Sequence, residues 1–135
     1  MQPSPEIRAL VMRGMQLTAA KDLPAVLDLA TREPGFLLMG TAPSEWFTSA
    51  AAAEPMIRAS LEGGSGQIPD NVEIEACQEG SVGWAGVRWR SQLPNGASIA
   101  LRWTQIFHQE GGMWKLVHGH VSVAVPDELV MNVAQ

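Results

Sequence analysis

The chain has 135 residues, of which 46% are hydrophobic and 17% are charged. This length and composition are typical of one globular domain, and they exclude a disordered or fibrous protein. The 14 acidic residues outnumber the nine Lys and Arg residues, so the net charge is −5. That balance argues against a nucleic-acid-binding surface, which needs basic side chains gathered on one face.

The first helix is predicted over residues 5–20, because Ser4 is a preferred N-cap and Pro5 suits the first helical position. A second, shorter helix begins at Asp22 and ends before Pro34. Residues 36–39 are apolar and bounded by glycines, which favours a short buried strand.

A third helix is predicted to start within residues 41–45, where a hydroxyl, a proline and an acid follow one another. It would carry Trp46 and Phe47 and continue to Leu61. Pro55 is expected to kink or divide it. Residues 62–67 are rich in glycine and form a loop.

From Pro69 onward, apolar residues alternate with polar ones, which predicts strands over residues 72–77 and 82–93. The strongest signal is a long hairpin over residues 97–125 that turns at Gly111-Gly112. Helices followed by consecutive strands indicate an α+β fold with helices on one face of an antiparallel sheet. The tail at residues 127–131 is expected to cover a sheet edge or to help a partner chain dock.

Three pieces of the chain resemble the SnoaL-like domains of the nuclear transport factor 2-like superfamily. They are the bend at residues 20–23, the segment GTAPSEW at 40–46, and GMWKLVHGHVS at 112–122. The last piece is also similar to the closing strand of the association domain of calcium/calmodulin-dependent protein kinase. The likeness covers residues 5–126 and therefore the whole predicted domain.

This resemblance implies a cystatin-like cone, in which a strongly bent antiparallel sheet wraps the helices and leaves a deep pocket. The outer face of such a sheet usually pairs two subunits, so a homodimer is expected. The superfamily contains isomerases, cyclases, epoxide hydrolases and non-catalytic binding domains. The fold therefore does not select one activity.

Two known reactions of the superfamily are disfavoured. Ketosteroid isomerases use an aspartate base and a tyrosine in the oxyanion hole, but this chain has no tyrosine and residues 37–40 contain no acid. Epoxide hydrolases of the limonene type need an Asp-Arg-Asp network, whereas the four aspartates here all fall in predicted caps or turns. No catalytic residue and no cofactor are predicted.

A ligand pocket is nevertheless predicted from strand parity. Arg88 and Gln105 align by resemblance with pocket-facing positions of the kinase association domain. An arginine in an apolar cavity needs a carboxylate, which either a ligand or Glu45 would supply. The predicted ligand-binding residues are Trp46, Phe47, Trp84, Arg88, Trp103 and Gln105.

The opposite sheet face is predicted to carry His118 and His120 together with Trp89 and Arg102. Two imidazoles two residues apart share a strand face and could bind a metal, but no third ligand is evident. The alternative, which we favour, is that they form hydrogen bonds on the outer surface or at the subunit interface. An exposed tryptophan there indicates a homodimer.

The sequence thus predicts a SnoaL-like small-molecule-binding protein or enzyme with a tryptophan-lined pocket. Its ligand would be apolar, with or without an acidic group, and an enzyme would be an isomerase, cyclase or hydrolase. The alternative is a non-catalytic assembly or accessory domain that acts through its sheet face. The single cysteine, Cys77, cannot form an internal disulfide, and neither a secretory signal nor a membrane-length apolar run is present. A cytoplasmic location is therefore predicted, with no nucleic-acid or membrane partner.

Overall fold

The computed structural model describes residues 1–133, which form one seven-stranded sheet and four helices. The helices are α1 (Pro5–Ala19), α2 (Leu23–Asp28), α3 (Ala50–Gly63) and α4 (Asp127–Val133). The strands are β1 (Gln2–Pro3), β2 (Leu37–Met39), β3 (Trp46–Phe47), β4 (Glu73–Glu79), β5 (Val82–Gln92), β6 (Ser98–Glu110) and β7 (Met113–Ala124).

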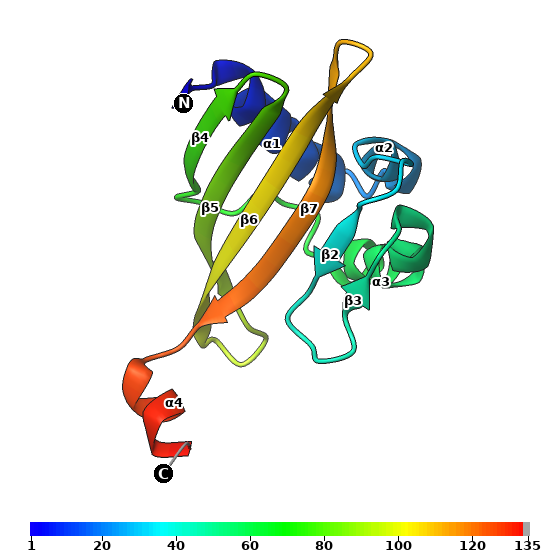
Figure 1. Cartoon of the computed structure of the whole chain (residues 1–135). Coiled ribbons are helices and arrows are strands. Elements are labelled where there is room, and N and C mark those ends of the chain that lie inside the picture. Colours follow the sequence, from blue (N-terminus) through cyan, green and yellow to red (C-terminus); the bar gives the residue numbers. More distant parts are fainter. Residues whose placement is uncertain (134–135) are drawn as a thin grey trace.

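The strand order is β1-β4-β5-β6-β7-β2-β3, and all pairs are antiparallel except β2 with β7, which are parallel. Figure 1 shows a strongly bent sheet, with α1 behind β4 and β5 and with α2 and α3 beside β2 and β3. The predicted α+β fold is confirmed. No helix in the described part of the chain is long and apolar enough to span a membrane.

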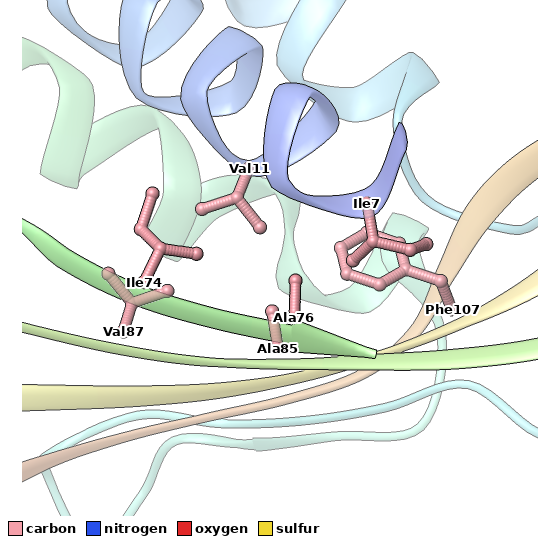
Figure 2. Close-up of a cluster of buried hydrophobic side chains, with 7 residues drawn as sticks. All are labelled: Ile7, Val11, Ile74, Ala76, Ala85, Val87 and Phe107. Atoms are coloured by element: carbon pink, nitrogen blue, oxygen red, sulfur yellow. The ribbon is translucent and has the colours of Figure 1, made fainter. Parts of the chain in front are cut away.

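The main hydrophobic core lies between α1 and the sheet. Ser4 caps α1, since its Oγ accepts a hydrogen bond from the backbone N–H of Ile7 at 3.1 Å. Ile7 and Val11 are fully or almost fully buried against β4, β5 and β6 (Figure 2). The buried members of this α1 cluster are Ile7, Val11, Ile74, Ala76, Ala85, Val87 and Phe107. We call the sheet face that carries them the inner face and the opposite one the outer face.

A second, smaller cluster joins α3 to β2 and consists of Phe36, Leu38 and Ala53. The helix begins later than predicted, at Ala50, because Ser49 is its N-cap and accepts from the Ala52 N–H at 3.1 Å. The prediction that Trp46 and Phe47 belong to the helix is wrong, since they form β3. Pro55 lies inside α3 without dividing it.

Residues 41–45 form a tight turn between β2 and β3 instead of the start of a helix. The backbone N–H of Gly40 donates to the Glu45 carbonyl at 3.0 Å. The Glu45 carboxylate accepts from the N–H of Ala42 at 3.3 Å. These bonds satisfy the backbone polar groups that a helix would otherwise satisfy.

The helix α2 is shorter than predicted because the residues after it pair with β7. The N–H of Thr31 donates to the Leu116 carbonyl, and the N–H of Leu116 donates to the Leu29 carbonyl, both at 2.9 Å. The chain therefore leaves the helix to extend the sheet.

The long hairpin is confirmed, with β6 and β7 paired from Glu110 opposite Met113 to Ala100 opposite Ala124. Both turn residues have positive φ, 56° at Gly111 and 80° at Gly112, a conformation that glycine adopts without strain. A β-bulge at Val117 interrupts the register. Beyond it, His118 and Gly119 continue the alternation between the two faces.

Candidate functional site

The register between β5 and β6 divides the predicted site residues between the two faces. Gln105 lies opposite Ala85 and Trp103 opposite Val87, so both point to the inner face. Trp84 and Arg88 have the other parity and lie on the outer face. The prediction that all four side chains line one pocket is therefore wrong.

Arg88 makes its ion pair on the outer face with the neighbouring strand. Its Nε and Nη2 both lie 2.6 Å from Oε2 of Glu73. The Arg88 side chain is 71% exposed. The predicted alternative partner, Glu45, is instead engaged in the turn before β3, so Arg88 pairs with a different acid from the one expected.

Trp46 and Phe47 also separate. Phe47 lies opposite Leu38 and packs against the second hydrophobic cluster. Trp46 lies opposite Met39, and Met39 is paired with His120 of the outer face. Trp46 therefore lies on the outer face, and it is 62% exposed. Only Phe47 of this pair is therefore directed to the interior.

Trp103 carries the one unsatisfied polar atom among the buried side-chain nitrogens and oxygens of the described residues. Its indole Nε1 has no hydrogen-bond partner, although an indole N–H can only donate. The ring reaches over Gly119, where an added Cβ would lie 3.1 Å from Nε1 and 2.9 Å from Cδ1 of Leu38. Gly119 thus gives the indole room to cross β7.

Gln105 follows Trp103 on the same face and is only 5% exposed. Its amide supplies two donors and one acceptor. Three further inner-face side chains near this pair are Leu101, Val121 and Val123, of which the first two are half-buried and the third is exposed. They belong to neither hydrophobic cluster. Beside the α1 cluster, the inner face thus carries partly exposed apolar side chains next to two buried polar groups, the Trp103 Nε1–H and the Gln105 amide.

Three of the four residues predicted for the outer face lie on it. His118, His120 and Arg102 lie there as expected, opposite Ile106, Thr104 and Ser122 respectively. Trp89 does not, because it points inward and packs against the α1 cluster.

The two histidines make no evident metal site. Nδ1 of His118 is 2.9 Å from the Leu37 carbonyl oxygen, a hydrogen bond to the neighbouring strand. Among the described residues, no three His, Cys, Asp or Glu side chains are placed to hold a metal ion.

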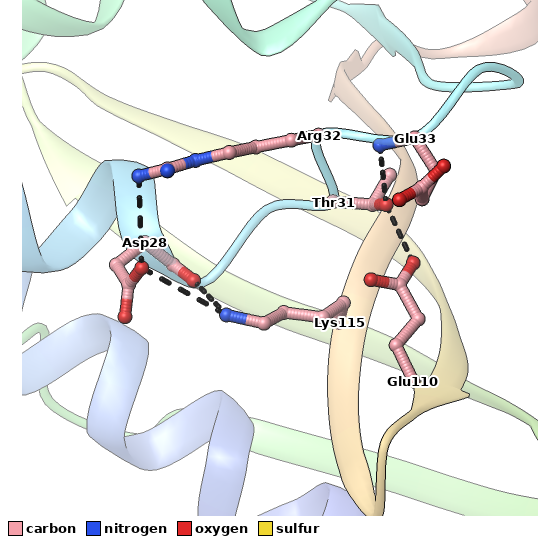
Figure 3. A network of polar contacts seen from close by, with 6 residues as sticks. All are labelled: Asp28, Thr31, Arg32, Glu33, Glu110 and Lys115. Atoms are coloured by element: carbon pink, nitrogen blue, oxygen red, sulfur yellow. Dashed lines mark hydrogen bonds and ion pairs between the residues drawn. The ribbon is translucent and has the colours of Figure 1, made fainter.

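A polar network fixes the α2–β2 connection to the far end of the long hairpin (Figure 3). Lys115 Nζ donates to the Asp28 carbonyl at 2.6 Å, and Thr31 Oγ1 donates to Glu110 Oε1 at 2.5 Å. The N–H of Glu33 donates back to Thr31 Oγ1 at 3.0 Å.

Thr31 and both glutamates also border an outer-face depression with Val82, Ile106 and Val117. None of the six predicted ligand-binding residues borders it.

Similar proteins share the fold across nearly the whole chain. A protein of unknown function from Pseudomonas putida KT2440, described as NTF2-like, is 20% identical with a TM-score of 0.71, covering 92% of this chain and 88% of its own. An NTF2-like protein with a cystatin-like fold from Novosphingobium aromaticivorans is 16% identical with a TM-score of 0.65, covering 96% and 87%.

A structure named as a candidate calcium/calmodulin dependent protein kinase II association domain, from Xanthomonas campestris, is 16% identical. Its TM-score is 0.65, with 92% of this chain and 95% of that chain covered. No curated protein sequence matches the chain significantly. The family model of the SnoaL-like domain matches residues 7–126, and the bent sheet with its inner helices agrees with that match. The chain therefore belongs to the SnoaL-like domain family.

Proposed function

We propose that this protein binds an apolar small molecule that carries a hydrogen-bond acceptor, on the inner sheet face beside Trp103 and Gln105. The observation that carries the proposal is the buried Trp103 Nε1–H without a partner. A buried donor left unpaired costs about 1–3 kcal/mol. The nitrogen is enclosed by the protein, with the Leu38 side chain beside it at Gly119. A ligand carbonyl or carboxylate oxygen that reaches it by moving Leu38 aside would remove that cost.

The surroundings support an apolar ligand. Leu101 and Val121 flank Trp103 on the inner face and are only partly covered by the protein. Gln105 would add a second, directional contact from its amide. Binding sites of this kind combine apolar walls with a few polar groups that fix orientation. The proposal assigns binding and no reaction, since neither polar side chain exchanges a proton near neutral pH.

A matched panel of three ring compounds tests the proposal: naphthalene, 2-acetylnaphthalene and 2-naphthoic acid. They share a ring system and differ in having no acceptor, a neutral acceptor or an anionic acceptor. The two acceptor compounds should raise the Tm of the wild-type protein. Trp103→Phe keeps an aromatic ring and removes the N–H, and it should weaken binding about tenfold.

Arg88→Gln is the control on the outer face and should bind both acceptor compounds as tightly as the wild type does. Equal shifts for all three compounds would contradict the role of the indole N–H, as would unchanged binding by Trp103→Phe. The absence of any shift would contradict the binding site itself. A stronger effect of the acid that Arg88→Gln abolishes would place the site on the outer face instead.

For the second candidate function, assembly through the sheet, we propose a homodimer formed by the outer faces. Trp84 is exposed there and lies opposite Ile106, next to the exposed Val82. Contiguous exposed apolar side chains of this kind mark interaction surfaces. Trp84→Glu should shift the sedimentation coefficient from dimer to monomer, whereas an unchanged coefficient would contradict this arrangement.

A further inference from the structure

The C-terminal helix α4 projects away from the domain after β7 and is far from the other helices (Figure 1). Its large apolar side chains Leu129, Val130 and Met131 are all more than half exposed. Its first turn carries two acids, Asp127 and Glu128. An apolar and acidic helix held in solvent needs a surface to cover, and the domain does not supply one in this arrangement.

The outer face holds an arginine cluster with the opposite character, formed by Arg88, Arg90 and Arg102. Arg88 and Arg102 lie directly opposite each other on β5 and β6, and like charges in that position repel. Glu73 neutralises Arg88. No acidic side chain of the described residues forms an ion pair with Arg90 or Arg102, so the cluster retains an excess of positive charge in a chain whose net charge is negative.

We propose that α4 of one copy lies on the outer face of a second copy, with Asp127 and Glu128 facing the arginine cluster. Its apolar side chains would then cover the area around Trp84. The chain supplies both the acidic helix and the cationic face, and a two-fold dimer uses each of them twice. This exchange rests on the proposed outer-face dimer and is independent of ligand binding on the inner face.

Charge complementarity favours the outer face over the inner face as the surface that α4 covers. The inner-face side chains close to the end of β7 are Leu101 and Val123, which are apolar and offer no cation to the two acids. On the outer face, Arg102 lies opposite Ser122, two residues before the end of β7 at Ala124. The arginine cluster therefore sits at the end of the sheet from which the helix leaves, which suits reciprocal exchange between two copies.

Two full-length charge-reversal variants test the exchange. The face variant carries Arg90→Glu and Arg102→Glu, and the helix variant carries Asp127→Lys and Glu128→Lys. All four positions are exposed, so both variants should fold, which circular dichroism verifies. In sedimentation experiments at low salt, each variant alone should dimerise at least about tenfold more weakly than the wild type, because like charges then meet.

An equimolar mixture of the two variants should restore the wild-type dissociation constant. In the mixed dimer, each helix again meets a face of opposite charge. A helix that folds onto its own chain predicts no such rescue, so two weak variants that stay weak when mixed would overturn the proposal.

A third variant, Leu129→Ser with Met131→Ser, removes apolar area without changing charge and should also weaken the dimer. Wild-type dimerisation in all three variants, or a wild-type protein that sediments as a monomer, would overturn the proposal. Ligand binding by the monomeric variants would leave the inner-face function intact, so the two proposals fail separately.

Discussion

The two faces of the sheet are built from the same four long strands and differ in what organises them. On the inner face, Ile74 and Ala76 of β4 and Val87 of β5 are apolar and belong to the core beneath α1. On the outer face, Arg88 and Arg102 stand opposite each other, and Trp84 shares that face. Within residues 1–133, no helix covers this face of the long strands (Figure 1). The inner face is therefore specified by burial, and the outer face by charge.

The largest expected effect is in the core of the inner face. Ile7 is fully buried, so Ile7→Ala should lower the free energy of unfolding by about 2–5 kcal/mol. Val82→Ala on the outer face is the matched control and should change it by less than about 0.5 kcal/mol. Urea denaturation followed by tryptophan fluorescence measures both, and equal losses would show that the faces are not distinct.

The next largest effect is expected at glycines. A Cβ at Gly119 would come within 2.9 Å of Leu38 and 3.1 Å of Trp103, while a Cβ at Gly86 would meet nothing within 4 Å. Gly119→Ala should therefore destabilise the protein by about 1–3 kcal/mol and displace the indole. Gly86→Ala, on the outer face, should leave the Tm within error; a larger loss there than at Gly119 would refute the assignment of the faces.

A smaller effect is expected for the Arg88–Glu73 pair, since both side chains are mostly exposed. Exposed ion pairs contribute at most about 1 kcal/mol. A double-mutant cycle with Arg88→Ala and Glu73→Ala should give a coupling energy below that value, and it should fall further in high salt. These values apply to the monomer, in which both side chains are exposed. A coupling of several kcal/mol in the monomer would contradict the exposed position of the pair.

The smallest effect concerns pH. The N-terminal ammonium of Met1 donates to Oε1 of Glu79 at 2.8 Å, and this hydrogen bond with its charge lowers the pKa of Glu79 below its ordinary value of 4.5. The stabilisation is present above that value and is lost as the pH falls through the lower, folded pKa. NMR titration should show the lowered midpoint, and acetylation of Met1 should raise it; a midpoint unaffected by acetylation would disprove the pairing.

The sequence predicted those features that depend on local chemistry. The long hairpin followed from alternation and two glycines, and the cap at Ser4 followed from residue type. The start of α3 was missed because residues 41–45 satisfy their backbone groups in a turn, and a turn and a helix start use the same residue types.

The face on which each predicted site residue lies depends on how neighbouring strands pair. The alternation of residues within one strand does not reveal that pairing. Trp84 and Gln105 each alternate correctly along their own strands, yet the register places them on opposite faces. A usable signal was present: Arg88 and Arg90 share the parity of Trp84, while Ala85 and Val87 form the apolar parity that faces a core. The partnerless indole of Trp103 arises from packing over Gly119 and has no counterpart in sequence.

The most direct test of the inner-face site is the indole N–H itself. The five tryptophans each give one side-chain signal in a ¹H–¹⁵N correlation spectrum, and Trp→Phe variants assign them. On titration with 2-acetylnaphthalene, the Trp103 signal should move downfield while those of Trp46 and Trp84 stay in place. Movement of the Trp84 signal with an unchanged Trp103 signal would contradict the account and place the ligand on the outer face.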